Sequence, residues 1–348
     1  MSQDALRFKV RCPHCDKVFI VTAPGSLTTK EAPQAPAPPP IEEKPQLAPP
    51  PPPPEEIELE EDFDMTPEEE NFRERIVNLI LDKKFELPML PHVALKVIRL
   101  TGDTNTNMQD LAKVILTDQT IVTKIIQISN SPVYAGTVEI KNINQALVRL
   151  GQTEIKNMML AISLQTKIFK SKMYGNLARK FWERSVGVAF ASRVIAGELK
   201  ADKDEAFLCG LMHNLGKMIT VTVIENAQRK METDFKPSRL LVLSILKQFH
   251  KDVGELTIDK WSLPATVANT IHYIDRLDEI EENMVDVPIV ALAETFCRVA
   301  GIGGEHPEDI DLSMLPATHL LNLGADASLD LYDRFIMVFE NARNEFIY

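Results

Sequence analysis

The chain has 348 residues, enough for two or three domains, and 45% of them are apolar, so a sizeable core can form. The formal net charge of −12 is uneven, because residues 1–70 hold 6 basic and 15 acidic residues while the rest holds 32 and 35. The nearly neutral second part excludes the strongly basic footprint typical of a nucleic-acid-binding domain.

Targeting and redox signals point to one compartment. The first residues lack the apolar core of a signal peptide, and no run approaches the ~18–20 apolar residues of a membrane span. The four cysteines are two at Cys12 and Cys15, followed by Cys209 and Cys297 in apolar surroundings. This is not the pattern of a disulfide framework. We therefore expect a cytoplasmic protein without a membrane span.

Residues 1–23 predict a short hairpin, because alternating apolar residues flank a Cys-Pro-x-Cys turn. The stretch is similar to the first half of small bacterial zinc-ribbon domains, but the chain has no second Cys-x-x-Cys. Three interpretations stay open. Cys12 and Cys15 bind zinc that is completed by another subunit or by His14, or they form a degenerate ribbon without metal, or they are a redox dithiol. Neighbouring basic residues keep nucleic-acid binding as a weak alternative, against the acidic run that follows.

Residues 24–66 predict a disordered linker that is first proline-rich and then acidic. Pro49 to Pro54 are unbroken, which favours polyproline II and a semi-rigid spacer. A docking site for a proline-reading module is the alternative. Residues 55–70 hold ten acidic residues and no basic residue, as is typical of a solvated run.

From residue 67 to the end the apolar spacing is helical, and we predict an all-α, two-lobed domain whose lobes meet near residues 151–174. Thr66-Pro67-Glu68-Glu69 provides an N-cap, a proline at N1 and a glutamate at N3. Asn107 and Asp118 are further N-cap candidates, and Gly151 is expected to end a helix. Other helices are expected at about 92–100, 153–170 and 176–199.

This succession resembles the HDOD domain, a non-catalytic relative of the HD and HD-GYP phosphohydrolases. The resemblance covers roughly residues 72–300, with a core at about 85–285 inside a helical domain of residues 67–348. The matching positions are Leu87-Pro88-x-Leu90-Pro91, Asp118, Asn130-Ser131, Tyr134, Ile143 to Gly151, Phe181-Trp182, Ser185, Gly210-Leu-Met-His213-Asn-Leu-Gly216-Lys217, His250, Val253-Gly254, Trp261-Ser-Leu-Pro264 and His272.

The resemblance also implies where metal ligands would lie. In catalytic relatives a His-Asp pair binds a divalent metal, but Asn214 follows His213 here, and Arg184 stands where a further histidine is expected. His250 and His272 match histidine positions, and a late acidic ligand would fall near Glu294. A two-metal site needs bridging carboxylate. A guanidinium would favour an anion or pair with Glu294. We expect a vestigial pocket whose histidines are structural, with an anion or nucleotide pocket and a single transition metal as alternatives.

The sequence therefore predicts a non-enzymatic signalling scaffold that binds proteins, with no cofactor in the helical domain and zinc at Cys12 and Cys15 as the one metal candidate. A spacer that joins a folded domain to a small docking element raises the effective concentration of partners. The alternative is a metal-dependent phosphohydrolase or cyclic-dinucleotide phosphodiesterase with an atypical ligand set. The expected partners are signalling proteins. Their identity, and whether the domain forms a homodimer, stay open.

Overall fold

In the computed structural model the described residues are 7–11, 18–22, 64–87, 90–101, 107–134, 136–168, 173–231, 235–304 and 306–347. The chain divides into two compact units, residues 1–52 and 53–348. In the first unit, strands β1 (Arg7–Arg11) and β2 (Val18–Thr22) pair antiparallel, which gives the expected hairpin. Cys12, Cys15 and most of the linker lie outside the described residues, so the zinc and linker predictions stay predictions.

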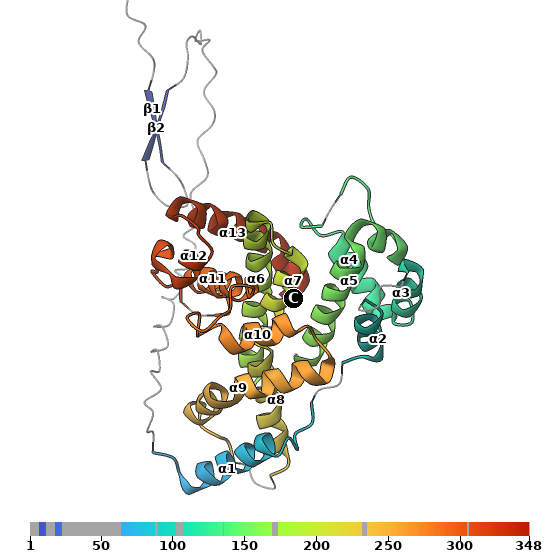
Figure 1. Cartoon of the computed structure of the whole chain (residues 1–348), viewed down its shortest axis with the longest axis vertical. Helices are drawn as coiled ribbons and strands as arrows, with labels where there is room; N and C mark the ends of the chain where they lie inside the picture. The colour runs from blue at the N-terminus through green and yellow to red at the C-terminus, as the bar shows by residue number, and fades with distance from the viewer. Residues whose placement is uncertain are drawn as a thin grey trace, which may run out of the picture. The chain divides into compact units, whose positions relative to one another are not determined.

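The second unit is helical, as predicted, in all the regular elements that its described residues form (Figure 1). The helices are α1 (Pro67–Leu81), α2 (His92–Thr101), α3 (Met108–Ile115), α4 (Gln119–Ser129), α5 (Ile143–Ile168), α6 (Gly175–Leu199), α7 (Lys203–Met212), α8 (Leu215–Arg229), α9 (Arg239–Trp261), α10 (Ala265–Tyr273), α11 (Asp286–Val299), the 3-10 helix η1 (Leu312–Met314), α12 (Pro316–Leu320) and α13 (Ala325–Ile347).

Side chains that the sequence singled out do cap the first helices. Thr66 and Glu69 form a reciprocal capping box at the start of α1, with Pro67 at N1. Asn107 Oδ1 accepts a hydrogen bond from the first turn of α3, and Asp118 Oδ1 accepts two at the start of α4. These bonds satisfy backbone donors that have no partner inside the helix. The local predictions of helix starts are confirmed.

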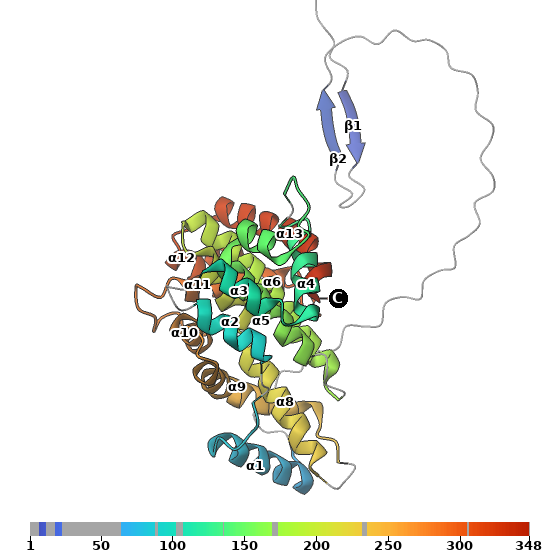
Figure 2. The ribbon, with the colours of Figure 1, turned by 90° about the vertical axis from the view of Figure 1, so that its right-hand side faces the viewer.

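One lobe consists of α2, α3 and α4 packed against α5 (Figures 1 and 2). Gly151 interrupts α5 with φ +83° and ψ 171°, so a helix ends there as predicted. The chain resumes helical geometry directly afterwards, and the two segments form one kinked element. Beyond the kink, Asn157 Nδ2 of α5 donates a 2.9 Å hydrogen bond to the carbonyl of Asp204 in α7. Gln165 Oε1 accepts a 2.8 Å hydrogen bond from Lys124 of α4, so the second half of α5 contacts both lobes.

The other lobe is built around α6, which packs against α7, α11 and α13, while α8 pairs with α9. Helix α1 precedes the first lobe in sequence but packs against α8 and α9, and both ribbon views show it beside them at one end of the helical unit. Phe72 of α1 contacts Phe235 ahead of α9, with ring centroids 5.3 Å apart.

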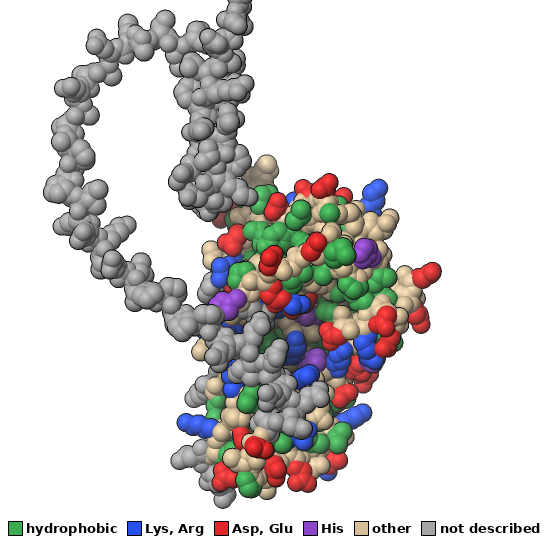
Figure 3. Space-filling view, turned by 90° about the vertical axis from the view of Figure 1, so that its left-hand side faces the viewer, with side chains coloured by type: hydrophobic (Ala, Val, Ile, Leu, Met, Phe, Trp, Pro, Cys, Tyr) green, Lys and Arg blue, Asp and Glu red, His purple; other side chains and the backbone are tan. Residues whose placement is uncertain are grey.

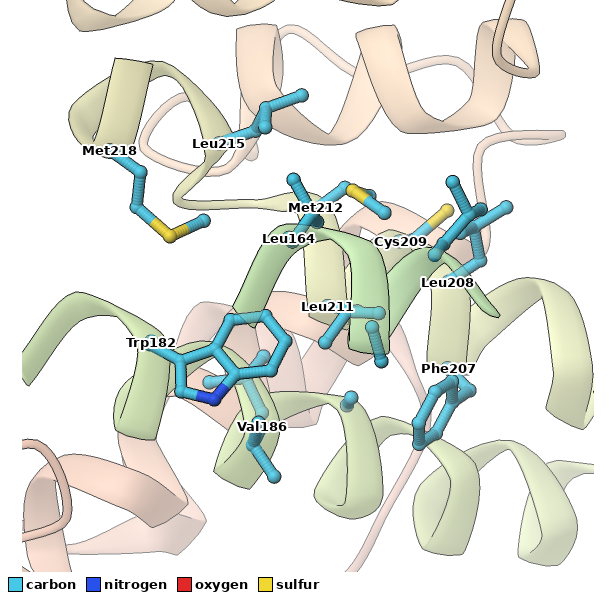
Figure 4. Packing of buried hydrophobic residues seen from close by; sticks show 14 of the residues in the cluster. Leu164, Trp182, Val186, Phe207, Leu208, Cys209, Leu211, Met212, Leu215 and Met218 are labelled. Carbon is cyan, nitrogen blue, oxygen red and sulfur yellow. The ribbon is translucent and has the colours of Figure 1, made fainter. Parts of the chain in front are cut away.

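Buried apolar side chains from α5, α6, α7 and α8 pack against one another in the core (Figure 4). Trp182, Phe207, Leu211 and Leu215 are almost fully buried there, and the Trp182 indole donates a 2.8 Å hydrogen bond to the carbonyl of Phe346. Among the described residues, one stretch, Lys203–Arg229, is long and apolar enough to cross a membrane. The protein buries 89% of its most apolar window, so here it serves as core.

A buried polar network joins the two lobes. Arg193 of α6 donates to the Tyr134 hydroxyl and Glu154 Oε1, each at 3.0 Å, and to Asp204 Oδ1 at 2.7 Å. Tyr134 in turn donates to Glu154. The Arg193 guanidinium carbon lies 4.7 Å from the centroid of the Phe207 ring. Because removing one member would leave buried partners unsatisfied, this network fixes the relative position of α5, α6 and α7.

Candidate functional site

The histidine motif lies at the tight turn between α7 and α8. His213 is the C-cap residue of α7, and Asn214 is the N-cap residue of α8. The glycines on each side allow close packing. A Cβ on Gly210 would lie 2.8 Å from the α6 backbone at Ala189, and one on Gly216 would lie 1.7 Å from the carbonyl oxygen of His250 on α9. The turn is therefore pressed between α6 and α9.

His213 faces Glu294 across this turn. The carbonyl of Gly210 accepts a 2.6 Å hydrogen bond from the ring Nδ1, which assigns a proton to that nitrogen. The other nitrogen, Nε2, lies 3.2 Å from Glu294 Oε2, and the His213 side chain is only 4% exposed. The ring that would be a metal ligand in a catalytic relative is directed at a carboxylate here.

Arg184 of α6 holds the other oxygen of the same carboxylate. Its Nη1 donates to Glu294 Oε1 at 3.0 Å, and its Nε donates to the carbonyl of Ile302 at 2.8 Å. Ile302 lies in the loop after α11, and this loop packs closely against Arg184. Gly303 permits the close packing, because it has φ +86° and a Cβ there would lie 3.1 Å from the Arg184 side chain. The Arg184 side chain is 4% exposed and that of Glu294 is 27% exposed.

The electrostatics of this cluster favour the ionised carboxyl. Burial raises the pKa of Glu294, but the hydrogen bond and charge of His213, together with the charges of Arg184 and Lys217, outweigh it and lower the pKa to about 2. The structure thus brings together Arg184, His213 and Glu294, which we call the ion cluster.

Asn214 and Lys217 complete the surroundings of the cluster. Asn214 is 3% exposed, it does not cap α8 with its side chain, and its Oδ1 has no hydrogen-bond partner among the described residues. Lys217 lies one turn after His213, with its Nζ 5.9 Å from the centroid of the Phe181 ring. Lys217 was quoted only as part of the sequence motif, and no helical spacing links it to His213, which ends the preceding helix. The contact between Arg184 and the carbonyl of Ile302 could not be predicted from the sequence.

The two remaining predicted histidines have separate contacts. His250 Nδ1 donates to the carbonyl of Leu246 within α9, and burial, then the nearby Lys217 charge, lower the His250 pKa. His272 lies on α10, where Nδ1 is 2.6 Å from Glu255 Oε1 and Nε2 accepts from Arg276 at 2.7 Å. His272 is therefore held by Glu255 and Arg276, and its described contacts do not join it to the ion cluster.

The residues around Glu294 are a poor match for a metal site, because basic side chains surround the carboxylate. Within the described ranges no group of three His, Cys, Asp or Glu side chains is arranged to hold a metal ion. Arg184 and Lys217 add two positive charges around one carboxylate, and a cation would have to compete with both. On the face in Figure 3, histidine and basic side chains gather at mid-height. Among the described residues the arrangement binds a carboxylate internally, and the position after His213 holds an amide instead of a carboxylate that could bridge two metal ions.

Comparisons with known proteins define the class. The model of the HDOD domain family matches residues 87–277, more than half of the chain. The chain belongs to the HDOD family. A Treponema pallidum (strain Nichols) protein named only as uncharacterized is 27% identical over 247 residues, which are 68% of this chain and 47% of that protein. The chain spans about half the length of that relative.

Solved structures show the same fold. An HDOD domain protein of unknown function from Geobacter sulfurreducens has a TM-score of 0.61 at 18% identity, over 79% of this chain and 99% of that one. A Shewanella amazonensis SB2B protein whose name proposes a metal-dependent phosphohydrolase also scores 0.61, at 22% identity, over 79% and 100%. A Marinobacter aquaeolei VT8 protein whose name proposes signal transduction scores 0.55 at 17% identity, over 82% and 67%.

Proposed function

We propose that this HDOD protein is a non-enzymatic signalling module that binds other proteins and does not hydrolyse phosphoesters. The observation that carries the proposal is the ion cluster. One oxygen of Glu294 accepts a 3.0 Å hydrogen bond from Arg184, and the other lies 3.2 Å from His213 Nε2. Among the described residues of the pocket, the carboxylate is therefore held by an internal cation, Arg184.

Metal binding would have to undo these contacts. Arg184 is 4% exposed and is anchored by the carbonyl of Ile302 as well as by Glu294, so its charge has no short path to solvent. A cation placed on Glu294 would have to displace the buried guanidinium of Arg184 from the carboxylate, and removing one partner of a buried ion pair typically costs ~3–5 kcal/mol. Asn214 offers a neutral amide where a hard cation favours a carboxylate.

The proposed partners are signalling proteins, and the proposed compartment is the cytoplasm. The name of the Marinobacter aquaeolei VT8 relative refers to signal transduction, which supports the class of process. Cys209 and Cys297 are free thiols buried in the helical unit, which suits a reducing compartment. Zinc at Cys12 and Cys15 remains the one cofactor that we propose, and nucleic acid is not among the proposed partners.

A metal-dependent phosphohydrolase is the second candidate. Two features favour it, the name of the Shewanella amazonensis SB2B relative and the retained His213 and His250. This function requires metal at the ion cluster, and metal occupancy therefore separates the two candidates.

The first experiment measures hydrolysis by the full-length protein. Phosphomonoesters and cyclic dinucleotides are offered with Mg²⁺, Mn²⁺ or Fe²⁺ to wild type and to Asn214→Ala. We expect neither protein to show metal-dependent turnover. Turnover of wild type that Asn214→Ala abolishes would refute the proposal, whereas turnover that survives the substitution would indicate a contaminant or another site.

The second experiment restores the ligands that the chain lacks. Bound Mn²⁺ is measured in wild type and in Arg184→His/Asn214→Asp, and Mn²⁺ is chosen because the Cys12 and Cys15 thiolates favour softer metals. We expect little Mn²⁺ in wild type and more in the double variant. Arg99→His/Asn71→Asp, which makes the same changes at exposed positions, should match wild type. Stoichiometric Mn²⁺ in wild type would contradict the proposal.

A further inference from the structure

A second feature lies outside the ion cluster, a cavity of about 640 Å³ between the first turns of α6 and α9. Leu177 of α6 and Val242 and Leu243 of α9 provide apolar walls. The volume falls in the range of ligand-binding pockets. Arg184, His213 and Glu294 do not line it, so this cavity, which we call the α6–α9 groove, is separate from the ion cluster.

In the described part of the chain, the charged side chains that line the groove have one sign. Every charged residue among its described lining residues is basic, namely Arg179, Lys180 and Arg239. The groove also contains the start of the 25-residue helix α6, whose N-cap residue Tyr174 makes no side-chain capping bond. The amides of residues 175–177 donate to no acceptor in the described part of the chain. Basic side chains, helix-start amides and apolar walls together suit a ligand that is acidic and apolar at once.

The chain carries such a segment close by in sequence. Residues 55–63 read Glu-Glu-Ile-Glu-Leu-Glu-Glu-Asp-Phe, six acidic residues interleaved with three apolar ones. The structure does not describe their placement. The chain that follows them is anchored beside the groove, because Glu69 Oε1 of α1 accepts a 3.1 Å hydrogen bond from the amide of Ser238. Ser238 lies between Pro237 and Arg239, which both line the groove.

Residues 55–63 are long enough to reach along the groove, and their negative charge complements its basic residues. Nine extended residues span roughly 30 Å, at ~3.3 Å per residue, so a segment that ends near the groove can cover its length. A covalent tether presents the segment at an effective concentration in the millimolar range. We propose that the α6–α9 groove binds residues 55–63 of the same chain, with carboxylates on the basic rim and the α6 start and with Ile57, Leu59 and Phe63 against the apolar walls.

The bound segment makes the groove a regulated surface. An acidic, amphipathic segment of another protein must displace residues 55–63 before it can bind. For a tethered concentration on the order of 1 mM and an intrinsic Kd on the order of 0.1 mM, the tether weakens binding of a competing peptide about tenfold. The same ratio slows hydrogen exchange at the covered amides about tenfold.

The first test measures hydrogen exchange at residues 175–177 in the full chain. A neutralised chain carries Glu55→Gln, Glu56→Gln, Glu58→Gln, Glu60→Gln and Glu61→Gln. We expect exchange to be about tenfold faster in the neutralised chain and in Arg179→Glu/Arg239→Glu than in wild type. The control Lys96→Glu/Arg99→Glu reverses two exposed charges on α2 and should match wild type. Equal exchange in wild type and the neutralised chain would overturn the proposal.

The second test adds a synthetic peptide of residues 55–65 to the folded chains. The peptide should bind the neutralised chain about tenfold more tightly than wild type, and Arg179→Glu/Arg239→Glu should abolish binding. Equal affinity for wild type and the neutralised chain would overturn docking within one chain. Protection that rises with protein concentration would assign the segment to a second copy. Protection by millimolar inorganic phosphate without any effect of the segment would assign the groove to small anions. Either result refutes the proposal.

Discussion

Replacing Glu294 by glutamine tests the ion cluster directly. Its carboxyl pKa falls from 4.5 to about 2 in the folded protein, and one pKa unit corresponds to about 1.4 kcal/mol. The ionised carboxylate therefore contributes about 3 kcal/mol to the free energy of unfolding at pH 7. This agrees with the ~3–5 kcal/mol lost when one partner of a buried ion pair is removed. Glu294→Gln removes the ionised carboxylate from this buried pair, so we expect a loss of about 3 kcal/mol.

The sign of the pH dependence follows from the lowered pKa. The contribution is complete above pH 4.5, where the carboxyl is ionised in both states, and it is lost as the pH falls toward 2. Urea unfolding of the full chain, followed by helical circular dichroism, should therefore give a difference between wild type and variant that is largest near pH 7 and shrinks below pH 4.5.

Two comparisons make the test specific. Glu308→Gln breaks a pair with Arg298 whose side chains are 30% and 44% exposed, and it should cost less than about 1 kcal/mol. Arg184→Met/Glu294→Gln removes both charges and should recover much of the loss. A loss below 1 kcal/mol for Glu294→Gln, or a loss that does not change between pH 7 and pH 3, would refute the assignment of Glu294 as a buried counter-ion.

Three further substitutions probe other parts of the helical unit. Gly216→Ala places a Cβ 1.7 Å from the carbonyl oxygen of His250, and the clash should lower the free energy of unfolding by more than about 3 kcal/mol. An unchanged urea midpoint would contradict the close packing of α8 on α9. Burial and neighbouring carboxylates raise the pKa of Asp286 to about 6. Asp286→Asn should therefore stabilise the protein above pH 6 and should no longer do so below about pH 4. Equal stabilisation at both pH values would argue against a raised pKa of Asp286. Tyr134→Phe removes a hydroxyl that bonds Arg193 and should lower stability by ~1–3 kcal/mol, measured as a lower Tm, and an unchanged Tm would show that the network does not join the lobes.

Sequence reasoning succeeded where the determining contacts are local. The capping box of Thr66 and Glu69 and the helix end at Gly151 depend on residues within a turn of one another, and both are present. The packing of α1 against α8 and α9 was not predicted, because apolar spacing shows that a helix has a buried face but does not show which partner covers it.

The candidate site divides in the same way. The sequence singled out His213 and Asn214 by their motif, and the charge of Arg184 suggested that it would pair with Glu294, but the helix boundary between His213 and Asn214 comes from the structure. The hydrogen bond from Arg184 to the carbonyl of Ile302 could not be predicted, because every residue has a carbonyl and only the fold determines which one accepts from the guanidinium. His272 matches a ligand position in sequence, yet Glu255 and Arg276 hold it, and neither residue belongs to the motif.

The two glycines that flank the His213 turn have a consequence for how such motifs are used in genome annotation. Gly210 and Gly216 are required by helix-to-helix clearance, whatever happens to the chemistry between them. A pattern search that rewards these glycines and His213 reports the shape of the turn, and it does not test whether an acid stands beside the histidine. A functional label for related chains is therefore better assigned from positions 184 and 214, where this chain has arginine and asparagine, than from the glycines.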